Sequence, residues 1–346
     1  MVHTVLRVIA ALLLMLPAFA AADPITLKLS FFSSDRTVAY QTAIKPFVDA
    51  VNIEGRDIIR IDVYPSGTLG RVQKDLPQQV LDGTADIAFI IPGQNPERFV
   101  DNSVMELAGL FRDVREATLT YTRLIAADAL AGYREFYVIG AYATQPEIIN
   151  TRSPVRTLDD LKGLKIRVNN PMQAAALNEL GVLPRILAFN ETGPALNSGA
   201  IDGATVPPAQ LFDVGIGRFT GNHYLLATSV APLTLLMNRS VYDHLPPDAR
   251  DIIRKHSGEW IASRFINAYQ VIDKKNLADI TSDPRRAVVS PTPADLQSAQ
   301  QKFEHVIQAW AARGPHNQDL LNTTRSILAK LRQTETEADH TRGSQD

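Results

Sequence analysis

Strand-like and helix-like segments alternate along the first part of the chain, and this alternation restricts the fold more than any other feature of the sequence. Residues 25–31 and 59–64 alternate apolar and polar side chains, as half-buried strands do. Helical patterns cover 38–51 and 72–81, and the apolar run within 86–91 is typical of a strand buried on both faces. This order predicts an α/β unit with a mixed or parallel sheet.

The same alternation begins again after residue 150. Residues 157–163 predict a capped helical turn, 164–168 a short strand, and 172–180 a helix. A strong strand is predicted at 233–238, followed by one long helix that opens at 245–248. The chain has 346 residues, which is more than one hydrophobic core usually supports. We therefore expect two α/β lobes.

The first 22 residues have the pattern of a secretory signal peptide. Arg7 lies in the amino-terminal region, residues 8–16 are apolar, and Ala18 and Ala20 precede a plausible cleavage site. An uncleaved membrane anchor is the alternative, but the apolar run is much shorter than the ~20 residues that span a bilayer. Because the chain also lacks cysteine, we expect an exported protein of a bacterial periplasm.

Composition and missing motifs exclude several classes of function. Without cysteine there is no disulfide scaffold, thiolate zinc site, iron–sulfur cluster or cysteine nucleophile. A formal net charge of -2 predicts no binding to nucleic acid. The chain has no zinc-protease, serine-hydrolase or Walker A motif, its histidines are scattered, and the glycines of 215–221 have the wrong spacing for a dinucleotide loop. We expect no enzyme activity, cofactor or metal.

Arg167 is the residue most indicative of a binding site. It lies near the end of the short predicted strand 164–168. An arginine that projects from a strand end into a cleft can bind a carboxylate through two parallel hydrogen bonds. From the strand alone, a surface arginine paired with a nearby acid is the alternative.

Four stretches in order show a family resemblance. They are residues 61–70, 81–88, 158–168 and 195–203. Each is weak alone, but the ordered set covers the chain from about residue 25 to 320. The chain resembles the solute-binding subunit of a tripartite ATP-independent periplasmic (TRAP) transporter, of the dicarboxylate-type DctP family.

This resemblance implies a fold, a site and a partner. The fold is two α/β lobes of the periplasmic binding-protein type, with mixed sheets flanked by helices, which close on a ligand. In the family, the arginine that matches Arg167 forms the main salt bridge to the ligand carboxylate. The partner is a membrane permease with two integral subunits, driven by an ion gradient. We therefore expect a periplasmic monomer that captures a small organic acid and delivers it unaltered to the permease.

Two departures from the family pattern bear on the ligand. An asparagine often precedes the proline at 207, where this chain has Val206, and a second arginine often lies near 144–147, where this chain has none. Losing two polar contacts favours a monocarboxylate with an apolar or aromatic part, because unpaired ligand hydroxyls are costly to bury. The candidate walls are Phe31, Phe32, Ile91, Phe189, Val206 and Phe212. The candidate hydrogen-bonding residues are Ser33, Ser34, Gln94, Asn169 and Asn170.

The predicted organisation has five parts. They are a signal peptide (1–22), lobe I (23–144 with about 232–272), lobe II (145–231 with about 273–300), C-terminal helices (301–332) and a disordered tail (333–346). Three alternative functions remain at this point: a ligand-sensing receptor subunit, an exported enzyme on the same fold, and a binding protein of an ATP-driven importer. The motifs around Arg167 and Asp202 argue against the last.

Overall fold

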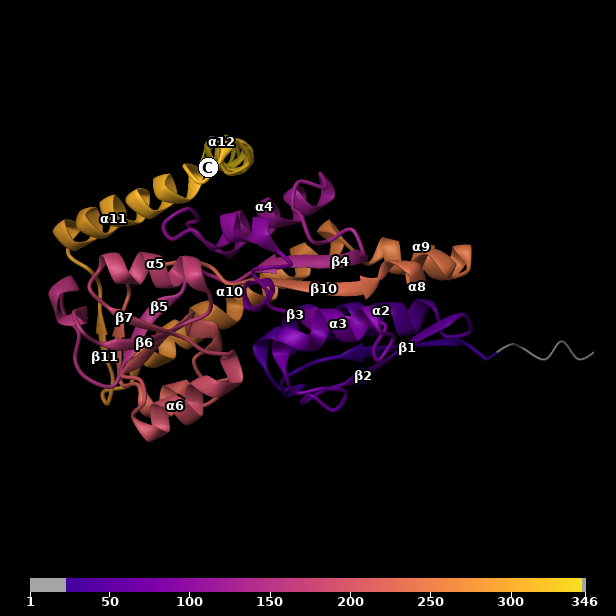
Figure 1. The fold of residues 1–346 in the computed structure, drawn as a ribbon, viewed down its shortest axis with the longest axis horizontal. Helices are drawn as coiled ribbons and strands as arrows, with labels where there is room; N and C mark the ends of the chain where they lie inside the picture. The colour runs from indigo at the N-terminus through magenta and orange to yellow at the C-terminus, as the bar shows by residue number, and fades with distance from the viewer. Residues whose placement is uncertain (1–22, 344–346) are drawn as a thin grey trace, which may run out of the picture.

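Two sheets, each with its own helices, divide the molecule into two lobes (Figure 1). The computed structural model describes residues 23–343, so the predicted signal peptide lies outside the described residues. We call the part around the five-stranded sheet lobe I and the part around the six-stranded sheet lobe II. Lobe I lies to the right in Figure 1 and lobe II to the left.

The sheet of lobe I has the strand order β2-β1-β3-β10-β4. Its strands are β1 (Ile25–Ser30), β2 (Ile59–Tyr64), β3 (Ile87–Ile90), β4 (Phe136–Ala143) and β10 (Pro232–Asn238). β1 is parallel to β2 and β3, whereas β10 is antiparallel to β3 and β4. The predicted mixed sheet is therefore present, and β10 enters it after the chain has built most of lobe II.

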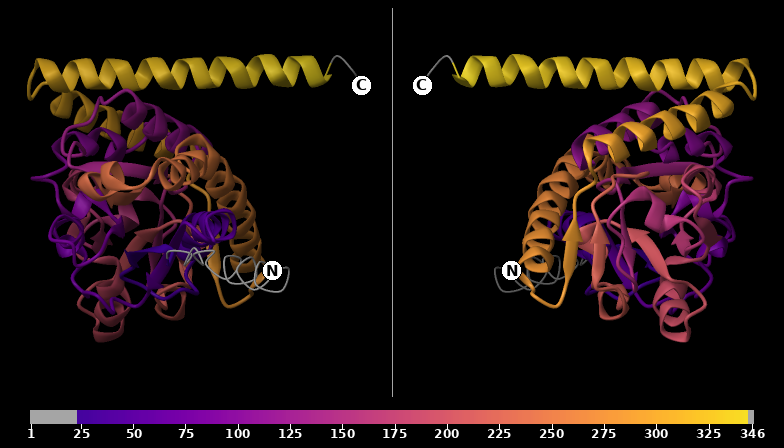
Figure 2. Two further views of the ribbon diagram at one scale, coloured as in Figure 1. Left: turned by 90° about the vertical axis from the view of Figure 1, so that its right-hand side faces the viewer. Right: turned by 90° about the vertical axis from the view of Figure 1, so that its left-hand side faces the viewer.

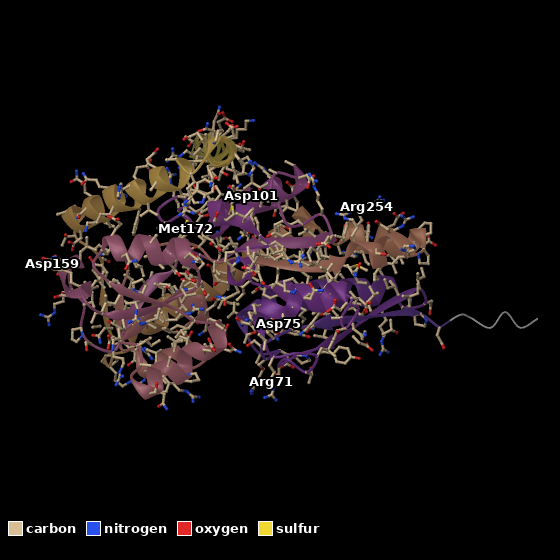
Figure 3. The ribbon with its side chains drawn as sticks, in the orientation of Figure 1. Arg71, Asp75, Asp101, Asp159, Met172 and Arg254 are labelled. Atoms are coloured by element: carbon tan, nitrogen blue, oxygen red, sulfur yellow. The ribbon has the colours of Figure 1, made fainter. Side chains whose placement is uncertain are left out.

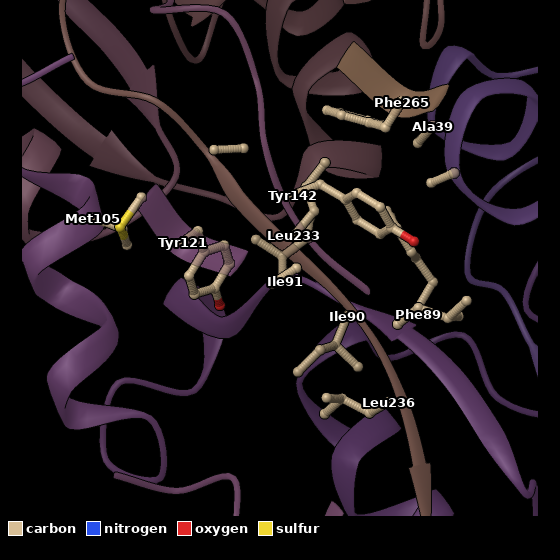
Figure 4. Packing of buried hydrophobic residues seen from close by; sticks show 14 of the residues in the cluster. Ala39, Phe89, Ile90, Ile91, Met105, Tyr121, Tyr142, Leu233, Leu236 and Phe265 are labelled. Carbon is tan, nitrogen blue, oxygen red and sulfur yellow. The ribbon is translucent and has the colours of Figure 1, made fainter. Parts of the chain in front are cut away.

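The helices of lobe I cover this sheet. They are η1 (Tyr40–Ile44), α2 (Lys45–Glu54), η2 (Gln73–Asp75), α3 (Leu76–Leu81), η3 (Pro92–Gln94), η4 (Val100–Glu106), α4 (Val114–Ala126), α8 (Arg239–His244) and α9 (Pro247–Lys255). Figure 4 shows part of the buried hydrophobic core around this sheet, with Phe89, Tyr142, Leu233 and Phe265 among its side chains. Burying a side chain of this size contributes about 1.5–3 kcal/mol.

The sheet of lobe II has the order β11-β9-β5-β8-β6-β7. Its strands are β5 (Ile148–Thr151), β6 (Lys165–Val168), β7 (Leu183–Ile186), β8 (Gly203–Val206), β9 (Asn222–Tyr224) and β11 (Ala287–Val289). Its helices are η5 (Leu158–Leu161), α5 (Pro171–Glu179), η6 (Phe189–Glu191), α6 (Thr192–Ser198), η7 (Pro208–Gln210) and α7 (Ile216–Phe219). β6 lies inside the sheet, between β8 and β7, and so places Arg167 away from the sheet edge.

One long helix, α10 (Glu259–Ser282), connects the lobes. It contacts β4 and α4 in lobe I and η7 and β11 in lobe II. The sequence predicts a single helix from 245 onward, but the structure divides it into α9 and α10. The break before α10 lies at Gly258, which has a positive φ of 59° and donates its N–H to the carbonyl of Ile139 at 2.8 Å.

Two helices complete the chain. α11 (Pro293–Ala311) packs against α5, and α12 (Pro315–Gly343) packs against α4. Figure 2 shows α12 as one straight helix that lies across the top of the molecule and extends past it. The segment from 333, which was predicted as a disordered tail, continues α12 as far as Gly343. Ion pairs from Arg332 to Glu116 and from Arg115 to Glu335 join α12 to α4 near the start of this segment. No helix within residues 23–343 is both long and apolar enough to cross a membrane.

Candidate functional site

A small cavity lies between the two lobes. Lobe I contributes aromatic and aliphatic walls that include Phe31, Phe32, Phe89 and Ile91. Lobe II contributes Asn169, Phe189, Gln210 and Asp213. The cavity volume is about 20 Å³, which is about the room that one water molecule needs. The lobes are therefore closed in this structure, and we call the space between them the cleft.

Arg167 on β6 is fully buried. It is not among the residues that line the cavity, but it lies against Phe189, which does line it. The neighbouring Ile166 and Val168 belong to the core of lobe II, so the arginine between them points to the other face of the sheet. Its Nε donates to the carbonyl of Leu187 at 3.1 Å, and its Cζ lies 5.8 Å from the ring centroid of Phe189. Within residues 23–343, Nη1 and Nη2 have no hydrogen-bond partner.

Burial lowers the pKa of Arg167 to about 10, while the nearby Glu147 and Glu191 act in the opposite direction. The guanidinium therefore remains charged at neutral pH. A buried charge with two unpaired nitrogens is costly unless something pairs with it. The geometry suits a carboxylate, which accepts two parallel hydrogen bonds from the two terminal nitrogens of an arginine.

Glu147 is the acid one would expect to pair with Arg167, yet its carboxylate is held elsewhere. One oxygen accepts from the side-chain amide of Asn169 and the other from that of Gln173, both at 2.6 Å. Within the described part of the chain, no ion pair joins Glu147 to Arg167. Burial raises the pKa of Glu147, and the charge of Arg167 opposes this shift. Because the amides of Asn169 and Gln173 hold the carboxylate of Glu147, this carboxylate does not bind the terminal nitrogens of Arg167.

The turn from β6 into α5 fixes Asn169 in place. Asn170 caps α5 by accepting from the backbone N–H of Gln173 at 2.8 Å, and Pro171 occupies the first turn of the helix. The side-chain oxygen of Gln173 accepts from the backbone N–H of Asn169 at 2.8 Å. Met172, labelled in Figure 3, marks this inner end of α5. The cap thereby positions Asn169 at the cleft wall, next to Arg167.

Two hydrogen bonds cross between the lobes at the cleft. The side-chain amide of Gln94 donates to the carbonyl of Asn169 at 2.7 Å. The backbone N–H of Val38 points at both carboxylate oxygens of Asp213, at 3.2 and 3.1 Å. Asp213 is half-buried in the cleft wall, and this burial raises the pKa of its carboxyl to about 7. Closure therefore depends on polar contacts as well as on the aromatic walls.

A match to a protein-family model shows which family the chain belongs to. The model of the bacterial extracellular solute-binding proteins, family 7, known as DctP, matches residues 29–313. The chain belongs to the DctP family. This confirms the predicted resemblance to TRAP solute-binding proteins and the predicted two-lobed α/β fold.

Relatives with named ligands lie within this family. The C4-dicarboxylate-binding periplasmic protein DctP of Rhodobacter capsulatus is 28% identical over 258 residues, which are 72% of this chain and 75% of that protein. The 2,3-diketo-L-gulonate-binding periplasmic protein YiaO of Escherichia coli is 28% identical over 247 residues, which are 67% of this chain and 72% of that protein. Both relatives are named as periplasmic binding proteins.

Solved structures share the fold. A TRAP solute-binding protein from Rhodoferax ferrireducens, in complex with copurified benzoate, has a TM-score of 0.82 and 27% identity and covers 90% of this chain and 99% of its own. A marine metagenome TRAP solute-binding protein, specific for aromatic acid ligands, has a TM-score of 0.81 at 21% identity and covers 88% of this chain and 99% of its own. The second likeness bears on the fold alone.

In this DctP-family chain, three predicted site residues lie away from the cleft. Phe212 is 46% exposed, and its ring centroid lies 5.4 Å from the guanidinium of Arg286 on an outer face, because the turn after η7 directs its neighbour Asp213 inward instead. The Ser34 hydroxyl bonds locally to Asp35 and Arg36. Val206 is fully buried in the core at the end of β8 and is not among the residues that line the cavity.

Other predicted residues do meet at the cleft. Phe31, Phe32, Ile91, Ser33, Asn169 and Phe189 line the cavity, and Gln94 bridges the lobes beside it. The sequence reasoning missed Asp213 and Gln210, which follow β8, and Phe89, which lies within the apolar run it assigned to a buried strand. Within residues 23–343 no cluster of histidine, aspartate or glutamate has the arrangement of a metal site.

Proposed function

We propose that the chain captures an aromatic monocarboxylate in the cleft and delivers it to the membrane permease of a TRAP transporter. The observation that carries this proposal is the buried Arg167, whose two terminal nitrogens have no partner in the described part of the chain. A ligand carboxylate would pair with both nitrogens and neutralise the buried charge. The phenylalanine walls would contact the body of the ligand.

One of the solved relatives supports an acid of this kind, whereas the two sequence relatives are named for a C4-dicarboxylate and for a sugar acid. The Rhodoferax ferrireducens protein was found with copurified benzoate, at an identity of 27% over most of both chains. The acidic Glu147 lies in the region where this family often has a second arginine, which makes the cleft less suited to a second carboxylate. We place the mature protein in the periplasm after cleavage of the signal peptide, and we expect it to be a monomer that closes around its ligand.

Isothermal titration with benzoate tests the role of Arg167. Replacing Arg167 by Ala should weaken binding by at least ~3 kcal/mol, since a buried carboxylate loses its charged partner. Arg167→Lys should also bind poorly, because an ammonium cannot form the two-point contact. The control is Arg185→Ala, because Arg185 lies opposite Arg167 on the neighbouring strand β7 but is exposed. Equal affinity in Arg167→Ala and the unmodified protein would contradict the proposed role.

A thermal-shift screen tests the ligand class. Benzoate, phenylacetate, cyclohexanecarboxylate, succinate and glucuronate would be compared, since a ligand that binds the folded protein raises its apparent stability. We expect the aromatic acids to give the largest shifts, and a larger shift with succinate or glucuronate would contradict the aromatic assignment. Uptake of labelled benzoate by the source bacterium should depend on the intact gene and fail with Arg167→Ala, which separates transport from binding alone.

A further inference from the structure

The cleft contains a second polar region that the carboxylate contact does not explain. Asp213 and Gln210 reach it from the segment after β8, and Thr37 and Ser33 face it from the segment after β1. The remaining walls are mainly aromatic and aliphatic. An acidic side chain in the wall of a site that captures an anion is unfavourable, unless the ligand gives it something to bind.

Asp213 has acceptor capacity to spare. Its two oxygens share one donor, the backbone N–H of Val38, whereas an ionised carboxylate offers about four acceptor positions. Within residues 23–343, no lysine, arginine or histidine lies within ion-pair distance of it. Burial raises the pKa of Asp213 to about 7, and the hydrogen bond from Val38 acts in the opposite direction.

The surroundings of Asp213 are themselves rich in acceptors. The hydroxyl of Tyr269 on α10 is buried, and its pKa is raised by burial first and then by the charges of Asp273, Asp213 and Glu147. The carboxylate of Asp273 accepts from the backbone N–H of Ala209 at 3.0 Å, next to Gln210. The charges of Asp273, Asp213 and Glu147 thus all act on Tyr269 at the junction of the lobes. These three acids disfavour any further negative charge there.

We propose that Asp213 is the specificity-determining residue of the cleft and selects aromatic acids that carry a hydroxyl group on the ring. The carboxylate of such a ligand binds Arg167, and its hydroxyl donates to Asp213. This inference rests on the proposed function, because it names the class of acid that the same cleft takes. A site built to receive a hydroxyl discriminates strongly against an analogue without one, since Asp213 then keeps Val38 as its one donor while the cleft excludes the water that could supply others.

Matched pairs of benzoates test this selection. Fluorine is similar in size to a hydroxyl group but cannot donate a hydrogen bond, so each of the 2-, 3- and 4-hydroxybenzoates is compared by isothermal titration with the fluorobenzoate of the same position. In the unmodified protein, at least one hydroxybenzoate should bind about tenfold or more tightly than its fluoro partner. In Asp213→Asn the ratio for that pair should fall below about threefold.

Asp213→Asn is chosen because an asparagine oxygen can still accept from Val38, so closure of the lobes is retained. The control is Asp159→Asn, because Asp159 lies at the outer end of lobe II in Figure 3 and is exposed, and this variant should keep the ratio of the unmodified protein. Binding of benzoates without preference for the hydroxyl, or a preference that survives in Asp213→Asn, overturns the inference alone. No binding of any benzoate overturns the proposed function together with it.

Discussion

The side-chain amide of Gln94 in lobe I donates to the backbone carbonyl of Asn169 in lobe II at 2.7 Å. This bond joins two segments that meet only when the lobes are closed, because Gln94 follows β3 and Asn169 follows β6. Asn169 also binds Glu147, which in turn lies near Arg167. The hydrogen bond between the lobes is therefore connected, through Asn169 and Glu147, to Arg167, the proposed ligand anchor.

Gln94→Ala should weaken ligand binding without removing the carboxylate contact. The variant loses a hydrogen bond that exists only in the closed state, so more of the ligand's binding energy is used to close the lobes. We expect a loss of about threefold to tenfold in affinity for benzoate by isothermal titration. Small-angle X-ray scattering should still show the lobes closing at saturating ligand.

The control for this variant is Gln78→Ala. Gln78 is an exposed glutamine on α3 whose amide bonds to Asp82 within the same lobe. Affinity in Gln78→Ala should equal that of the unmodified protein. The same affinity in Gln94→Ala would mean that the bond contributes equally to the open and closed states.

Glu106→Gln should stabilise the protein at alkaline pH. Burial raises the pKa of Glu106 to about 8, and its Oε1 has no hydrogen-bond partner within the described residues. A carboxyl whose pKa is raised by folding favours the folded state below its ordinary pKa, and this contribution is lost as the pH rises towards 8. The glutamine does not titrate. The free energy of unfolding of the variant should therefore exceed that of the unmodified protein by about 2–4 kcal/mol at pH 8, and by much less at pH 5.

Urea unfolding at pH 5 and pH 8 measures this difference. Asp213 and Asp273, whose pKa values burial raises to about 7 and about 6, contribute equally to both proteins and cancel in the comparison. Glu97→Gln, at an exposed position, serves as the control and should change stability little at either pH. A Glu106→Gln effect that is the same at both pH values would rule out titration as its cause.

Strands and helices could largely be predicted from the sequence where a segment is long enough to show a regular alternation of apolar and polar residues. β1, β2 and β10 lie within a residue or two of the predicted strands. β9 and β11 were not predicted, because their strands span only Asn222–Tyr224 and Ala287–Val289, too few residues to display a period. The break at Gly258 was missed for a different reason, since the apolar stripe continues across it.

The site was only partly predictable. Arg167 stood out because it lies near the end of a short predicted strand, where an arginine can project into a cleft, and the family resemblance named its role. Asp213 gave no such signal, since its contact with Val38 joins residues 175 positions apart. Phe212 was a candidate wall, but the structure exposes it and directs Asp213 to the cavity, because no periodicity shows which of two adjacent side chains in an irregular turn points inward.

Val206→Thr should destabilise the fold although the two side chains have nearly the same shape. Val206 is fully buried, and the surrounding core offers the new hydroxyl apolar neighbours. Burying a hydroxyl without a partner costs about 1–3 kcal/mol, measurable by urea unfolding at pH 7. Val271→Thr is the matched control, because Val271 is 68% exposed on α10 and its replacement should cost little. A similar loss in both variants would point to helix and strand propensities rather than burial.

Arg332→Ala should loosen α12 from lobe I. Nε and Nη2 of Arg332 bind the two oxygens of Glu116 at 2.7 and 2.8 Å, and the Glu116 side chain is 1% exposed. Burial alone would raise the pKa of Glu116, but the hydrogen bonds from Arg332 and from the backbone of Arg112 outweigh it and hold the pKa below its usual value. The pair therefore stabilises the fold above the ordinary pKa of a glutamate, and this contribution is lost as the pH falls through the lowered value.

Removing the arginine leaves a buried carboxylate without its partner, which should cost about 2–4 kcal/mol at pH 7, a range reduced because Arg332 is itself about a third exposed. Arg325→Ala removes a charge from the same helix, but Arg325 pairs with Glu304 at the surface and should contribute less than about 1 kcal/mol. Urea unfolding at pH 7 and at pH 3 compares the two. The loss in Arg332→Ala should be smaller at pH 3 than at pH 7, because the pair contributes less as the pH falls towards the lowered pKa of Glu116. Equal losses in the two variants, or a loss in Arg332→Ala that does not change with pH, would mean that the helix is held by its apolar contacts alone.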